Sequence, residues 1–140
     1  MLESIYNQTI TILNKLRRED NDGKTDIWYK TVVDNAVWYT DSARSAGSNA
    51  VYIGSYITIL LPFHEEYMDY EEWKKQVNKD ELFTVSVGDY IIKGTIEDEV
   101  NANNIVKVTQ KYGENVCLVR HHNANYDRFG ARVQLKIQGV

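Results

Sequence analysis

The chain has 140 residues, the length of a single domain, and its composition excludes several classes of protein. Hydrophobic residues make up 43% and aromatic residues 11%, which is too apolar for a disordered chain. The net charge of −4 argues against sequence-specific DNA binding, because such proteins usually carry a basic patch. Cys117 is the only cysteine, so no internal disulfide can form. No apolar run approaches the ~20 residues of a membrane span, and 1–4 lack the features of a secretory signal. We expect one domain, 1–140, that is made in the cytoplasm and has no contact with a membrane.

Alternation of apolar and polar residues with a period of two predicts most of the secondary structure. The pattern is rich in Val, Ile, Thr, Tyr and Trp, which favour a pleated, half-buried surface. Strands are expected at 9–12, 28–33, 35–39, 56–59, 85–87, 88–94, 106–108, 116–120 and 133–137. The segments 28–33 and 35–39 are also compatible with one long strand that is irregular near Asp34 and Asn35.

One short helix is expected at 69–78. Asp69 precedes Glu72 by three positions, the spacing of a capping box, and Trp73 and Val77 then share one face. A weaker helical turn is expected at 97–103, and a compact turn at 112–115 would join the strands on either side. Many short strands and one helix predict a mainly β fold, a small barrel or sandwich of about seven strands.

The segment 41–50 differs from the rest of the chain because its residues are small and polar. Nothing in it can anchor to a core, so we expect a long mobile loop that contacts a partner. The predicted interface residues of this loop are Ser42, Ala43, Arg44, Ser45, Gly47 and Asn49.

The sequence contains no pattern typical of a catalytic, cofactor or metal site. His121 and His122, with Asp127 nearby, are the first metal candidates, but adjacent strand residues face opposite ways and rarely share an ion. Cys117 lies in an apolar strand and is expected to be an inert thiol. The pairs of adjacent acidic residues are more typical of a solvated surface than of the two catalytic carboxylates of a glycoside hydrolase. We therefore expect no enzyme activity and no cofactor, and assign the C-terminal loop an interface role through His121, His122, Tyr126 and Arg128.

Tyrosine and tryptophan are unusually frequent, with ten and three copies. Aromatic side chains on a β-barrel can stack on bases or sugars. They also fill small cores and anchor protein interfaces, and the acidic charge favours this second interpretation.

Four segments together resemble a family of small structural proteins. These are 9–15, 26–39, 59–63 with Leu61-Pro62-Phe63, and 88–94 with Gly88-Asp89-Tyr90. The set is similar to proteins encoded among the structural genes of tailed phages and prophages of Gram-positive bacteria, and covers about 9–111. The resemblance implies a head–tail connector or head-closure (stopper) protein of the virion neck. Such a protein is a small β-barrel with long loops that forms a ring between portal or adaptor and tail, with no catalytic residues.

The expected function is therefore structural, with a homo-oligomeric ring, hexameric or dodecameric, and phage portal, adaptor and tail proteins as partners. DNA would pass through the channel without sequence specificity, because an acidic surface repels phosphates. Two alternatives stay open: a tail-completion (terminator) or other minor tail protein, and a carbohydrate- or nucleotide-binding β-barrel. A connector or head-closure protein and a tail-completion protein would both be made in the bacterial host cytoplasm and then be incorporated into the virion neck.

Overall fold

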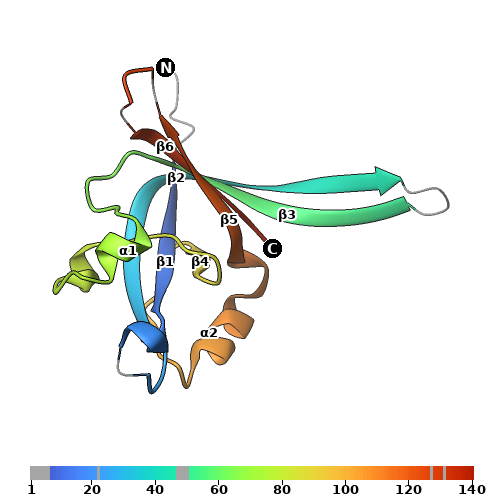
Figure 1. Ribbon diagram of the computed structural model, residues 1–140. Helices are drawn as coiled ribbons and strands as arrows, with labels where there is room; N and C mark the ends of the chain where they lie inside the picture. Colours follow the sequence, from blue (N-terminus) through green and yellow to red (C-terminus); the bar gives the residue numbers. More distant parts are fainter. Residues whose placement is uncertain (1–6, 22, 47–50, 127, 131) are drawn as a thin grey trace.

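Six antiparallel strands close into a barrel in the computed structural model, which describes residues 7–21, 23–46, 51–126, 128–130 and 132–140. At 41–46, 51–55 and 132 the backbone alone is described. Around the barrel the strands follow the order β1-β2-β3-β6-β5-β4 (Figure 1). The strands are β1 (Gln8–Leu16), β2 (Ile27–Ala46), β3 (Val51–Pro62), β4 (Tyr90–Lys93), β5 (Val116–Tyr126) and β6 (Arg132–Gly139). The predicted mainly β barrel is confirmed.

The connections contain two short α-helices, α1 (Tyr70–Trp73) and α2 (Ile105–Tyr112). They also contain three 3-10 turns, η1 (Arg18–Asp20), η2 (Lys79–Glu81) and η3 (Gly113–Asn115). No helix in the described part of the chain is long and apolar enough to cross a membrane.

Strand β1 is buried on both faces and is the centre of the packing. Ile10 and Ile12 are fully buried in the barrel core, while Thr11 and Leu13 are fully buried on the opposite face. This follows from the alternation of the strand, since successive side chains point to opposite faces. The core inside the barrel consists of aliphatic side chains from every strand together with one phenylalanine and the cysteine: Ile10, Ile12, Val33, Ala36, Ile57, Ile59, Leu61, Phe83, Val85, Ile91, Cys117, Val119, Leu135 and Ile137.

Helix α2 covers the outer face of β1 and corrects two predictions. Ile105, Val108 and Tyr112 all pack on a second cluster outside the barrel, built around Leu13. Spacings of three and four residues place these side chains on one face of a helix, so 106–108 is helical rather than a strand. The alternation seen there is coincidental, because Val106 is exposed. The helix also begins at Ile105, after a turn, rather than within 97–103.

Three further predictions were wrong in detail. The segment 85–87 is not a strand, because the Ser86 N–H donates to the Asp89 side chain rather than to a neighbouring strand; Val85 and Ser86 are buried, whereas Val87 is exposed. The helix predicted at 69–78 is only α1, four residues long, and Asp69 makes no capping hydrogen bond. Trp73 is fully buried, but Val77, which was expected to share its helix face, is fully exposed. The turn at 112–115 joins α2, rather than a strand, to β5.

Strand β2 is one continuous strand with an irregularity at the predicted place. Asn35 has a φ of 66°, in the left-handed region that asparagine tolerates better than most residues. The register between β1 and β2 shifts at the same place, between the Gln8 and Ile10 pairs. Thr9 Oγ1 donates to Asp34 Oδ1 at 2.9 Å across the irregularity. A bulge bends a strand, and just beyond this one β2 leaves β1 and pairs with β3 alone in the described residues.

Candidate interaction surfaces

The ends of β2 and β3 form a two-stranded arm that projects from the barrel (Figure 1). The β1 ladder with β2 ends at Ala36, and the β6 ladder with β3 begins at Ile57. Between these limits, 41–46 pairs only with 51–56 in the described residues. The backbone edges on both sides of the arm therefore have no strand partner there. The predicted 41–50 loop is thus the outer part of a hairpin as far as Ala46.

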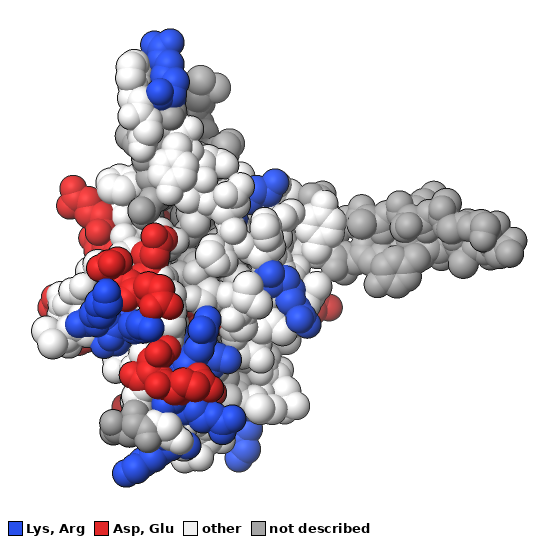
Figure 2. Space-filling model, viewed as in Figure 1, with Lys and Arg blue, Asp and Glu red and all other residues white. Residues whose placement is uncertain are grey.

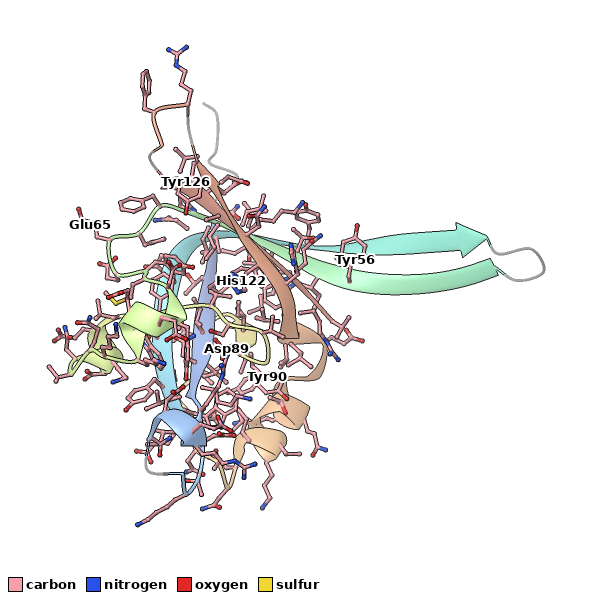
Figure 3. The ribbon with its side chains drawn as sticks, in the orientation of Figure 1. Tyr56, Glu65, Asp89, Tyr90, His122 and Tyr126 are labelled. Carbon is pink, nitrogen blue, oxygen red and sulfur yellow. The ribbon has the colours of Figure 1, made fainter. Side chains whose placement is uncertain are left out.

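A groove of about 580 Å³ lies at the root of the arm. Trp38 and Thr40 of β2 line one side, and Tyr56 of β3 lines it at the start of the arm (Figure 3). Lys93 at the end of β4 places its Nζ 5.7 Å from the centre of the Trp38 ring. The remaining lining residues come from β3, the turn before β5, the start of β5 and the C-terminus: Ile57, Gly113, Glu114, Asn115, Val116 and Val140.

A second hairpin, between β5 and β6, presents apolar and basic side chains to solvent. We call Tyr126, Arg128, Phe129 and Val133 the hairpin tip. Phe129 is 81% exposed, Tyr126 59% and Val133 47%. The Arg128 guanidinium lies 5.0 Å from the centre of the Phe129 ring. Figure 3 shows Tyr126 at the base of this projection, well away from Tyr56 at the arm.

An acidic groove of about 330 Å³ runs beside the β2 bulge. Its apolar floor includes Phe83 and Val33, both buried. Its other lining residues are mostly polar or acidic: Thr31, Val32, Asp34, Asn35, His64, Glu66 and Glu81. We call this whole set the acidic groove. Figure 2 shows that Asp and Glu gather over the segment that carries α1, whereas Lys or Arg occupies the end of the β5–β6 hairpin.

His121 and His122 lie near the middle of β5, away from the hairpin tip, and are mostly exposed. His122 lines a separate polar groove of about 340 Å³ beside α1, together with Arg17 and Tyr70. Partial burial is the main cause that lowers the pKa of His122, and His121 lowers it further. In this groove the Arg17 guanidinium stacks 4.5 Å from the Tyr70 ring centre, and the Tyr70 hydroxyl donates to Asp20 Oδ2 at 2.6 Å.

A buried polar cluster lies just beyond the ladder between β1 and β4, next to the start of β4. Asp89 is 1% exposed and accepts three hydrogen bonds, from Asn14 Nδ2 at 2.9 Å and from the backbone N–H groups of Ser86 at 2.9 Å and Lys15 at 3.1 Å. Asn14 also donates to the Thr84 carbonyl at 2.6 Å. Burial raises the pKa of Asp89 to about 6, although all three donors act to lower it. We interpret the cluster as structural.

Two observations bear on metal and thiol chemistry among the described residues. Among the described residues, no group of three or more His, Cys, Asp or Glu side chains is placed to hold a metal ion. Burial raises the pKa of the Cys117 thiol to about 12, so the reactive thiolate is strongly disfavoured.

The structure brings together only part of the predicted interface. Tyr126 and Arg128 share the hairpin tip, while the histidines lie elsewhere on β5. The backbone at Ser42, Ala43, Arg44 and Ser45 belongs to the arm, and Gly47 and Asn49 lie outside the described residues. Sequence reasoning missed Phe129, Val133 and the acidic groove. The alternating series that contains Leu135 and Ile137 also contains Val133, which was a usable signal that an apolar face continues beyond the barrel.

The fold and these surfaces define a closed six-stranded β-barrel with two projecting hairpins and several surface grooves. The chain belongs to the family described as "Family of unknown function (DUF6751)", whose model matches residues 5–140. No curated protein and no solved structure matches the chain.

Proposed function

We propose that this protein is a structural subunit of the neck of a tailed phage or prophage, a head–tail connector or head-closure protein that assembles into a ring. The observation that carries the proposal is the arm. An isolated two-stranded hairpin is at best marginally stable in water. An arm held as a ladder from Asp41 to Ala46, with both edges unpaired in the described residues, is suited to a partner that adds to its edges.

The barrel supports the same role. A closed sheet has no free edges of its own, so it stays rigid while the arm and the β5–β6 hairpin offer contacts. Identical subunits close into a ring when each presents two different, complementary surfaces to its neighbours. The net charge of −4 suits a ring around passing DNA, since an acidic channel repels phosphates.

The test is to remove the outer part of the arm and follow assembly. Deleting 42–49 is expected to leave the circular dichroism spectrum and the melting temperature of the barrel unchanged, because the barrel ladders end at Ala36 and begin again at Ile57. Ring formation, measured by light scattering and negative-stain microscopy of the protein with its portal or tail partners, should be lost. Rings that form normally without 42–49 would contradict the role of the arm.

Two outcomes would favour the alternatives. Rings that form only with tail-tube protein would indicate a tail-completion protein. A monomer at every concentration, whose tryptophan fluorescence changes with oligosaccharides or nucleotides, would indicate a ligand-binding barrel that uses the groove beside Trp38 and Tyr56.

A further inference from the structure

The hairpin tip exposes an apolar group and a charge to solvent. Phe129 and Tyr126 are mostly exposed, and Arg128 is exposed beside them. No ion pair involves Arg128 among the described residues, and its guanidinium contacts the Phe129 ring instead. An exposed aromatic ring next to an arginine is the composition that anchors protein interfaces.

The acidic groove has the opposite features. Asp34, Glu66 and Glu81 are exposed, and none of them forms an ion pair with any described residue. The Nε2 atom of His64, which lines the groove, is buried and has no hydrogen-bond partner within the described part of the protein. Beneath them, Phe83 provides an apolar floor. The groove therefore combines unpaired negative charge with an apolar surface.

We propose that the hairpin tip of one copy inserts into the acidic groove of the next copy and forms the subunit contact of a ring. The Phe129 ring packs toward Phe83, and Arg128 lies among the groove carboxylates. This inference rests on the proposed function and specifies its partner as a second copy of the chain.

Charge complementarity within the chain itself identifies this occupant. The segment 63–82 has seven acidic and three basic residues: Glu65, Glu66, Asp69, Glu71, Glu72, Asp80 and Glu81 against Lys74, Lys75 and Lys79. The segment 116–140 has four basic residues and one acidic residue: Arg120, Arg128, Arg132 and Lys136 against Asp127. Two different and complementary surfaces on one molecule give a heterologous contact, the type that generates rings when the rotation closes.

The test uses two charge-reversed forms of the full chain. Arg128→Glu disables the tip and leaves the groove intact, while the double variant Glu66→Lys/Glu81→Lys disables the groove and leaves the tip intact. All three side chains are exposed, so folding should be unaffected, and thermal unfolding checks this. Lys107→Glu on α2 and Glu97→Lys/Glu99→Lys are matched controls at exposed positions away from both surfaces.

Analytical ultracentrifugation then gives a distinct result for each variant and for their mixture. The wild type and the controls should form oligomers, while each reversed variant alone should weaken association at least tenfold and sediment near 16.2 kDa. Mixing the two reversed variants should restore association, because the intact tip of one variant meets the intact groove of the other, and the reversed tip then carries a charge opposite to that of the reversed groove.

Failure of this contact can be distinguished from failure of the proposed function. Oligomers that persist in both reversed variants, or a mixture that stays monomeric while the wild type associates, would refute the tip-in-groove contact and leave a ring protein. A wild type that is monomeric alone and with its phage partners would refute both.

Discussion

The buried carboxyl of Asp89 predicts an unusual dependence of stability on pH. The pKa of Asp89 is raised from 3.8 to about 6 in the folded protein, chiefly by burial. One pKa unit corresponds to ~1.4 kcal/mol, so this difference corresponds to about 3 kcal/mol. Because the folded state binds the proton more tightly, the contribution is fully present below pH ~4 and is lost as the pH rises through about 6. Above that pH the folded protein must bear the cost of a buried charge.

The substitution Asp89→Asn removes the titration and leaves most of the cluster. An asparagine oxygen can still accept from Asn14 Nδ2 and the Ser86 N–H, which both reach Asp89 Oδ2. The amide nitrogen then faces the N–H of Lys15 and loses one hydrogen bond, which costs about 1–3 kcal/mol. We therefore expect the variant to be less stable than the wild type near pH 4 and close to it near pH 7.

Urea unfolding followed by tryptophan fluorescence at several values between pH 4 and pH 7.5 measures this difference. The useful quantity is the difference in unfolding free energy between variant and wild type, because other titrating groups cancel. Asp98→Asn is the control of opposite sign, since hydrogen bonds from Tyr112 and Lys111 lower the pKa of Asp98, and its contribution is lost as the pH falls. Parallel curves for Asp89→Asn and wild type would refute the reasoning. A deficit of the variant that grows with pH would show that the three donors outweigh burial.

Two further predictions concern the packing of the barrel. Gly139→Ala should destabilise the protein by on the order of 1–3 kcal/mol in urea unfolding, because a Cβ there would lie 2.0 Å from the Leu118 carbonyl oxygen. The neighbouring Gln138→Ala should be nearly neutral. Equal effects of the two substitutions would argue against the close approach at Gly139. Cys117 is fully buried with a pKa near 12, so it should react with a thiol reagent only at the rate of unfolding, and labelling as fast as that of a free cysteine would contradict its placement in the core.

The alternation of apolar and polar residues determined much of the architecture. It located β1, β3 and β6, since the pattern is a direct consequence of side chains that point to opposite faces, but it also indicated strands at 85–87 and 106–108, where there are none. The local chemistry of Asp34 and Asn35 also located the bulge in β2. The segment 88–94 was predicted as a strand between two bends, and β4 (Tyr90–Lys93) lies between Gly88 and Gly94, which both adopt positive φ.

A pattern that extends over only three or four residues was too short to distinguish a helix from a strand. Val106 and Val108 alternate, but Ile105, Val108 and Tyr112 share the helix face that covers Leu13. The helix is favoured because it covers the apolar surface on the outer face of β1, and this surface exists only after the barrel has formed. In the same way, the buried segment around Val85 satisfies a backbone N–H with the Asp89 side chain, a contact that no local pattern indicates.

By itself, the sequence determined a mainly β domain, an irregularity near Asp34 and Asn35, and an unusual small-residue segment. Only the tertiary structure decided that the small-residue segment continues a two-stranded arm as far as Ala46, and that Glu66 and Glu81 line one groove with Asp34. These residues are separated by many positions in the chain, so their meeting depends on the order in which the strands close the barrel. Alternation fixes the face on which a side chain lies, and barrel closure fixes which distant side chains share a surface.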